Sequence, residues 1–252
     1  MHLRLSRGVF LLAAVILAGA CGGAESQPAA TPSRPDIDID IAANLFVNPG
    51  FELGEQPWFS ISTQAWGSPF RVSDAVAHSG QHSALLEMRA ASEATGDRVF
   101  GVVQEIIPGQ FPELLSGYYW VEDWARGTEK QYLQFVVIVM GATGLPGNFP
   151  NYQIRYLLAG IDEPPFQISN AHFVFVGKDE PVTGRWVYFE RNLHDDFEEL
   201  WGALPEMFLQ IRILFEVRYD DKPAGSGEVK ADVFYDDLYV GPAAANPSRQ
   251  EE

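Results

Sequence analysis

Cysteine is nearly absent from the sequence. The 252 residues include a single one, Cys21, so the chain cannot form an internal disulfide bond. Such a protein has to gain its stability from a hydrophobic core, helped by a bound metal where one is present. The lack of paired cysteines also excludes CxxC zinc sites and CxxC redox sites.

Positive charge is also scarce. The sequence has 17 Lys and Arg against 34 Asp and Glu, which gives a formal net charge of −17. Such a surface repels phosphate backbones, so we expect no nucleic acid as a partner. Acidic side chains instead favour solubility, and their oxygens can bind a hard cation such as calcium.

The common catalytic motifs are missing. The sequence contains no HExxH, GxSxG or CxxC pattern, and His78 and His82, four residues apart, lie in a Ser-Gly turn and not on a helix. Several acid pairs fall in predicted turns and are interpreted as solvated. We therefore assign no catalytic residue, although Glu122 and Glu216 are the pair to inspect for the two carboxylates that a glycosidase holds across a cleft.

The one apolar run of membrane-like character lies at the N-terminus. An uncharged stretch from Gly8 to Ala20 follows Arg4 and Arg7, which is the basic-then-apolar layout of a secretory signal peptide. The run is shorter than the roughly 20 residues that cross a bilayer. We therefore predict that residues 1–20 are a cleaved signal peptide and that the mature protein is extracytoplasmic.

The lone cysteine follows directly after the predicted cleavage site. The segment LAGAC (17–21) resembles a bacterial lipobox, in which the cysteine is acylated, although Ala18 stands where a large aliphatic residue is usual. The resemblance implies a lipid on Cys21 that holds the protein to a membrane of the cell envelope or surface, and plain secretion is the alternative. Residues 21–43 begin small, polar and rich in proline, and they are predicted to be a flexible tether.

What is abundant is the pattern of a β protein. Aromatic and β-branched residues are concentrated in short runs separated by Gly, Pro, Asn and Asp, which is typical of a sandwich or barrel. We predict an all-β domain over residues 44–241, followed by a disordered tail over residues 242–252. The predicted strands are 44–51, 83–88, 99–107, 115–122, 132–140, 152–158, 171–176, 186–191, 208–219 and 229–240.

Two of these runs and one connection carry further detail. The run LQFVVIVM (133–140) is apolar on both faces, so it belongs in the middle of a sheet. The run 208–219 alternates between apolar and polar residues, so one face is core and the other is largely polar. One short helix is predicted at DDFEELWG (195–202), where Asp195 would cap the helix and Glu198 follows three residues later.

Three segments, in order along the chain, resemble carbohydrate-binding modules of the family 4, 9, 16 and 22 group. They are NLFVNPGFELGEQPW (44–58), AHSGQHS (77–83) and VFYDDLYV (233–240), and the run from 184 to 191 is similar to a late strand of the group. The resemblance implies a galactose-binding-domain-like jelly roll, a β-sandwich of two antiparallel sheets with one short helix. The resemblance predicts the fold well but says little about the ligand, because the same sandwich carries many functions.

The resemblance also implies a structural calcium ion that ties the first strand to the last. The matching ligands are the Glu52 carboxylate, the main-chain carbonyl of the Gly80-Gln81 turn and the Asp236 carboxylate, with Asp237 as a substitute. Calcium takes about six to eight oxygen ligands of these kinds. The alternative is that these carboxylates only form hydrogen bonds in turns.

Exposed aromatic rings on a strand would make a platform for sugars, which stack their apolar faces on such rings. In SGYYWVEDW (116–124), strand alternation puts Tyr118, Trp120, Glu122 and Trp124 on one face. If this face is open to solvent it would bind a glycan, and the alternative is that these rings are core. The groove would be completed by loop residue Trp66 and, if their strands lie in the same sheet, by Gln210, Arg212, Glu216, Arg218, Gln134 and Arg155.

These features favour a non-catalytic, surface-anchored lipoprotein that binds a polysaccharide or another glycan. A structural or protein-interaction module of the envelope, with the same fold, is the first alternative. A glycan-cleaving enzyme of jelly-roll type is the second.

Overall fold

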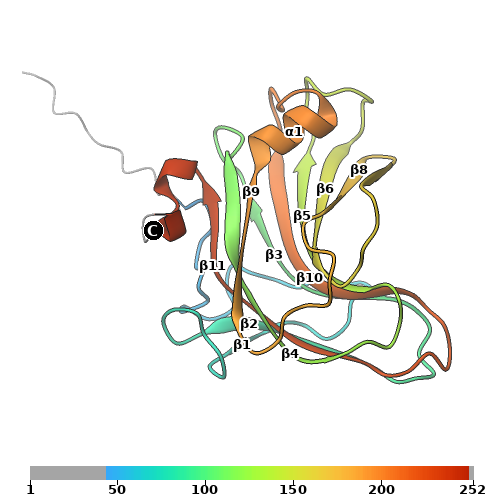
Figure 1. Ribbon diagram of the computed structural model, residues 1–252. Helices are drawn as coiled ribbons and strands as arrows, with labels where there is room; N and C mark the ends of the chain where they lie inside the picture. Colours follow the sequence, from blue (N-terminus) through green and yellow to red (C-terminus); the bar gives the residue numbers. More distant parts are fainter. Residues whose placement is uncertain (1–43, 250–252) are drawn as a thin grey trace, which may run out of the picture. The chain divides into compact units, whose positions relative to one another are not determined.

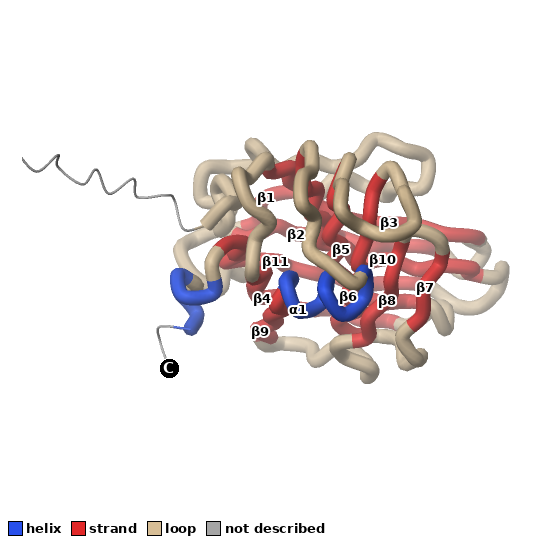
Figure 2. Tube along the Cα trace, turned by 90° about the horizontal axis from the view of Figure 1, so that it is seen from above, coloured by secondary structure: helices blue, strands red, loops and turns tan. Residues whose placement is uncertain are grey.

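The computed structural model describes residues 44–249; the predicted signal peptide, Cys21 and the tether lie outside this range. Within it the chain forms two β-sheets and one short α-helix, and the two sheets form a sandwich (Figure 1, Figure 2). The prediction of an all-β sandwich with one helix is confirmed. No helix of residues 44–249 is long and apolar enough to cross a membrane.

The first sheet has five strands in the order β1-β2-β11-β4-β9. Each strand is antiparallel to its neighbours. The strands are β1 (Arg71–Ser73), β2 (Ser83–Ala90), β11 (Val229–Gly241), β4 (Leu114–Ala125) and β9 (Trp186–Asn192).

The second sheet has six strands in the order β3-β10-β5-β6-β8-β7. All pairs are antiparallel except β6 with β8. These two run parallel because the chain leaves β6, forms β7 at the sheet edge and turns back into β8. The strands are β3 (Gly96–Ile106), β10 (Gln210–Lys222), β5 (Gln131–Met140), β6 (Asn151–Ala159), β8 (Ala171–Phe175) and β7 (Phe166–Ile168).

The core lies between the two sheets. Phe135 of β5 packs against Phe189 of β9 with ring centroids 5.2 Å apart, and Phe215 of β10 lies 5.4 Å from Tyr235 of β11. β5 lies between β10 and β6, and Val136 on its outer face is as buried as its core residues. The run that is apolar on both faces is therefore an interior strand, as predicted.

The segment 44–51 is a turn and not the predicted strand. Asn48 and Phe51 have φ angles of 55° and 60°, which a β-strand does not allow. The Asn48 side chain accepts a hydrogen bond from the Leu53 amide and donates one to the Gly54 carbonyl. These bonds hold the turn and bury Phe51 completely.

The helix α1 (Leu193–Trp201) begins two residues earlier than predicted. Its N-cap is Asn192 and not Asp195, because the Asn192 side chain accepts hydrogen bonds from the amides of His194 and Asp195 at 3.0 and 3.2 Å. The helix ends at Gly202, which has a φ of 79° and needs no Cβ there.

The segment after β11, which the sequence analysis predicts as a disordered tail, is described up to residue 249. It forms two 3-10 turns, η1 (Ala243–Ala245) and η2 (Pro247–Arg249). Asn246 between them is fully buried and donates to the Tyr188 hydroxyl at 3.0 Å. Arg249 forms an ion pair with Glu190. These contacts attach the tail to β9.

Candidate functional site

The structure divides the predicted sugar platform between the two sheets. The aromatic set of residues 116–124 lies on β4 in the five-stranded sheet, whereas Gln210 and Arg212 lie on β10 in the six-stranded sheet. Val121 next to Trp120 and Ile211 next to Arg212 belong to the core. The side chains of Trp120 and Arg212 therefore point to opposite sides of the sandwich. The single groove that would combine both sets is not formed.

On β4 the aromatic set is partly covered by other side chains. The His78 ring stacks on Tyr118 with ring centroids 3.6 Å apart. Trp120 meets Trp186 of β9 edge-on at 5.8 Å, and both Tyr118 and Trp120 are partly buried. Much of the ring surface that a sugar would need is therefore used by contacts within the protein.

The other two predicted residues of β4 lie further along the strand. Trp124 packs against the core and its indole donates a hydrogen bond to Glu180, whereas Glu122 is exposed. Glu122 and Glu216, the carboxylates considered for catalysis, belong to different sheets and point to opposite sides. They do not face each other across a cleft.

The predicted calcium ligands lie around the turn of residues 77–82. Glu52 Oε1 accepts hydrogen bonds from the amides of Gln81 and His82, each at 2.8 Å. Asp236 Oδ2 accepts one from the His78 amide at 2.7 Å. The carboxylates thus form the turn hydrogen bonds that were the alternative to a metal site.

A cation beside Asp236 would need main-chain oxygen ligands in addition to the nearby carboxylates. Asp236 is completely buried, and this burial together with the neighbouring Asp237 raises its pKa to about 7. A Cβ on Gly50 would lie 3.4 Å from Asp236 Oδ1 and 3.6 Å from Asp237 Oδ1, so both carboxylates lie close to Gly50. Among residues 44–249 no three His, Cys, Asp or Glu side chains form a metal site. Calcium would therefore need main-chain carbonyls such as that of Gln81, and it stays a prediction.

A cavity of about 330 Å³ lies on the outer face of the six-stranded sheet, and we call it the sheet cavity. Strands β5, β6, β7, β8 and β10 all contribute to it. Its lining includes Tyr132, Leu157, Phe166, Phe173, Phe175 and Arg218, with Lys130, Asp220 and Asp221 at one end.

One side of the sheet cavity is a cluster of hydrogen-bonding groups. The Tyr132 hydroxyl donates to Asp220 Oδ2 at 2.6 Å, and Arg218 Nε donates to Asp220 Oδ1 at 3.1 Å. The Arg218 guanidinium lies 5.6 Å from the centre of the Tyr132 ring. Burial raises the pKa of Tyr132, so its hydroxyl stays protonated and remains a donor.

Two buried polar residues lie next to this cluster on the same face. Gln134 donates to Glu216 Oε2, and the same oxygen is 3.8 Å from the Arg218 guanidinium. Gln134 is 0% exposed, and its Oε1 has no hydrogen-bond partner among the described residues. Unpaired buried acceptors are uncommon, but Gln134 is not exposed and does not line the sheet cavity.

The other side of the sheet cavity is aromatic. Phe166 of β7 stacks on Phe173 of β8 with ring centroids 4.5 Å apart and an interplanar angle of 17°. Phe166 keeps 37% of its surface exposed, and Phe175 lies 6.1 Å from it. Arg155 of β6 places its guanidinium 5.5 Å from the centre of the Phe173 ring. The cavity thus has an apolar ring surface on one side and charged donors and acceptors on the other.

The remaining predicted residues share this outer face but lie outside the cavity. Arg212 is six residues before Arg218 on β10, which is about 20 Å along a strand, and it pairs with a glutamate of β3. Gln210 is further still from the cavity. Trp66 lies over Gly101 of β3, beside Glu216.

Sequence reasoning missed Tyr132, Phe166 and Phe173. The two phenylalanines lie in the stretch 141–175, where no motif of the family resemblance was found. A usable signal was present, because FQI and AHFVF alternate on either side of Ser169-Asn170, which is a hairpin pattern. Ser169 indeed has a φ of 54°, and β7 pairs with β8 across this turn.

No protein-family model and no curated protein matches the chain. Among solved structures, it is similar to the module TmCBM61 in complex with β-1,4-galactotriose (18% identity, 78% of this chain and 97% of that one, TM-score 0.40). It is also similar to CBM28, described as specific for non-crystalline cellulose (14% identity, 77% of this chain and 93% of that one, TM-score 0.43). A third similar structure is the xylan-binding domain CBM22-1 of Paenibacillus barcinonensis Xyn10C (14% identity, 76% of this chain and 90% of that one, TM-score 0.38). Structures similar to this one thus include carbohydrate-binding modules.

Proposed function

We propose that the protein is a non-catalytic, carbohydrate-binding protein and that the sheet cavity is its glycan site. The observation that carries this proposal is the pairing of two surfaces across one cavity. The Phe166–Phe173 stack offers an apolar ring face, and the cluster of Tyr132, Arg218 and Asp220 offers donors and acceptors. Sugar rings present the complementary pair, an apolar face and a rim of hydroxyl groups.

We further propose that a lipid on Cys21 holds the exported protein at a membrane of the cell envelope. The lipobox-like segment 17–21 and the predicted signal peptide support this proposal. Partition of the protein into a detergent phase tests it. The native chain is expected in the detergent phase and a Cys21→Ser chain in the aqueous phase, and equal partition of both would contradict a lipid anchor.

The glycan site can be tested by isothermal titration calorimetry of the purified protein against soluble galactan, soluble xylan and a soluble cellulose derivative, the glycan classes named for the similar structures. Phe166→Ala removes the exposed half of the aromatic stack. Tyr188→Ala is a matched control, because Tyr188 is 39% exposed but lies on β9 in the other sheet. We expect Phe166→Ala to weaken binding at least about tenfold, or about 1.4 kcal/mol, and Tyr188→Ala to leave it unchanged.

Each other outcome points elsewhere. Loss of binding in Tyr188→Ala or Trp120→Ala, with Phe166→Ala unaffected, would move the site to the five-stranded sheet. No binding to any glycan by the folded protein would favour the protein-interaction alternative. One observation supports that alternative specifically, because β7 is a short edge strand whose three residues are all exposed, Ile168 to 61%. Exposed edge strands can pair with another chain.

A further inference from the structure

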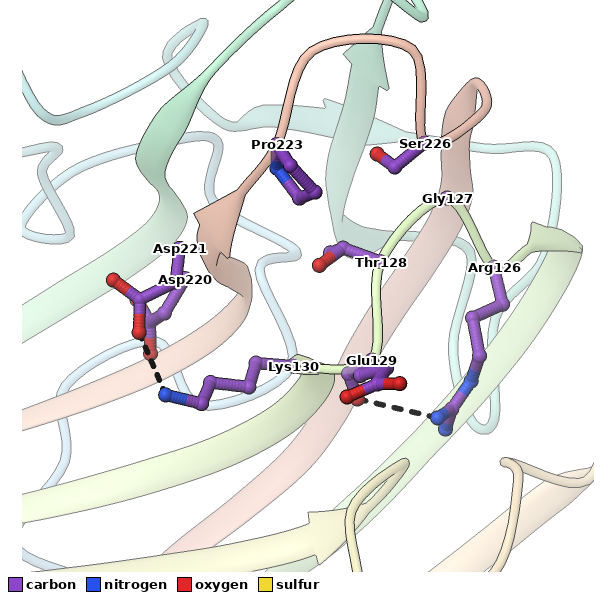
Figure 3. A pocket seen from close by; sticks show the side chains of 9 residues that line it. All are labelled: Arg126, Gly127, Thr128, Glu129, Lys130, Asp220, Asp221, Pro223 and Ser226. Carbon is purple, nitrogen blue, oxygen red and sulfur yellow. Dashed lines mark hydrogen bonds and ion pairs between the residues drawn. The ribbon is translucent and has the colours of Figure 1, made fainter.

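A second cavity adjoins the sheet cavity at the end of β10. It has a volume of about 570 Å³, and we call it the loop cavity. It lies between the β4–β5 connection (126–130) and the β10–β11 connection (223–228) (Figure 3). Lys130, Asp220 and Asp221 line both cavities. The two hollows therefore meet at these three residues.

The boundary between the two cavities includes a solvated ion pair. Lys130 Nζ lies 2.6 Å from Asp221 Oδ2, and the two side chains are 48% and 72% exposed. Figure 3 shows this pair at one side of the loop cavity. A solvent-exposed ion pair contributes little to stability, so a ligand that crosses this boundary can displace it at little cost.

The loop cavity has a different chemistry from the sheet cavity. It contains no aromatic ring, and Thr128 and Ser226 contribute hydroxyl groups (Figure 3). Lys222, only 2% exposed, donates to Ser226 Oγ at 3.0 Å and to the Ser92 carbonyl at 2.9 Å. The Ser226 oxygen acts as an acceptor for Lys222, so its own proton remains available to a ligand. The buried ammonium group strengthens that donor.

We propose, building on the glycan-binding function above, that an extended and uncharged polysaccharide chain runs from the sheet cavity past Lys130 and Asp221 into the loop cavity. Sugar units in the sheet cavity would stack on the aromatic wall. Units in the loop cavity would be held through their hydroxyl groups by Thr128, Ser226 and the adjacent main chain. The linings of both cavities hold more acidic than basic residues, and the whole chain carries −17, so an acidic glycan would be repelled.

The test is calorimetry of the purified protein with β-1,4-linked galacto-, xylo- and cello-oligosaccharides from disaccharide to hexasaccharide. We expect the affinity to keep rising beyond the trisaccharide. Thr128→Val, which keeps the side-chain shape, and Ser226→Ala are each expected to weaken hexasaccharide binding about three- to tenfold and to leave disaccharide binding unchanged. Thr143→Val, an exposed threonine beyond the other end of β5, is the matched control and should change nothing.

The outcomes separate this inference from the function on which it rests. If hexasaccharide binds no more tightly than disaccharide, or if Thr128→Val leaves hexasaccharide binding intact, the loop cavity is not part of the site, although the sheet cavity still binds glycan. The Ser226→Ala result is interpreted only if circular dichroism shows that the variant is folded, because the substitution removes a hydrogen-bond partner of Lys222. Tighter binding of polygalacturonan than of galactan would overturn the preference for an uncharged chain. Absence of binding at every length would be a failure of the proposed function itself.

Discussion

Trp66 lies directly over Gly101, where a Cβ would come within 2.6 Å of two atoms of the Trp66 indole. The missing side chain at Gly101 therefore lets the loop that carries Trp66 pack onto β3. Trp66 there joins a small second core on the outer face of the six-stranded sheet, formed by Val103, Val136 and Leu214. This contact fills the β3 side of the sheet face, whereas the sheet cavity lies toward β7 and β8.

Gly101→Ala is expected to destabilise the protein by about 1–3 kcal/mol, because the indole ring has to shift to admit a methyl group. Urea unfolding followed by tryptophan fluorescence measures the change. Gly109→Ala is the control, since a Cβ there meets nothing within 4 Å, and it should stay within about 0.5 kcal/mol of the parent. Equal midpoints for both variants would show that Trp66 does not pack on Gly101.

Asn192→Ala is expected to lower the free energy of unfolding by about 1 kcal/mol, because the Asn192 side chain caps α1. Asp195→Ala should cost less, since it removes only a negative charge near the helix N-terminus. Thermal unfolding followed by circular dichroism compares the two. A larger loss of stability in Asp195→Ala than in Asn192→Ala would show that Asp195 is the N-cap, as the sequence pattern predicted.

The contribution of His172 to the stability of the folded protein is expected to fall as the pH drops below about 6.5, the ordinary pKa of histidine. Burial lowers the pKa of His172, whose ring packs edge-on against Trp201 at 4.4 Å. The unfolded chain therefore takes up a proton that the folded chain resists, and protonation favours unfolding. Urea unfolding between about pH 5 and pH 8 should show a smaller acid loss in His172→Phe than in the parent. Identical pH profiles would contradict this account.

Calcium is expected to raise the melting temperature of the protein at neutral and alkaline pH. The pKa of Asp236 is raised to about 7 by burial and by Asp237, so the folded chain holds a proton that the unfolded chain releases from about pH 4 upward. The contribution of Asp236 to stability therefore falls as the pH rises from about 4 to about 7, and a bound cation would offset this loss. Differential scanning calorimetry with calcium and with chelator measures the shift, which should vanish in Asp236→Asn. No shift in the parent would leave these carboxylates as turn hydrogen-bond acceptors alone.

Much of the fold could be predicted from the sequence because it depends on local patterns. Nine of the ten strands predicted from alternation and turn residues have counterparts in the structure. The tenth, 44–51, looked like a strand by composition, but its Asn48 side chain forms turn hydrogen bonds that a hydrophobicity pattern does not reveal. The short strands β1 and β7, three residues each, carry too few positions for a period to show.

The candidate site was predictable only in part. The polar face of β10, with Arg218, was recognised from alternation alone. Phe166 and Phe173 were not, because their significance comes from β7 and β8 lying beside β6 at the edge of the sheet. Tyr132 was expected only as the start of a strand, and its role follows from its hydrogen bond to Asp220, 88 residues away.

The sequence by itself determined that the described part of this chain is an all-β sandwich and, for the strand predicted at 208–219, which face is core and which is polar. Only the tertiary structure decided which strands share a sheet, and this placed the aromatic set of β4 and the polar set of β10 on opposite outer faces. The physical reason is that alternation along a strand separates inside from outside within a few residues. The choice of pairing partner depends on hydrogen bonds between segments that can be more than a hundred residues apart, as β2 and β11 are. No local pattern records this choice.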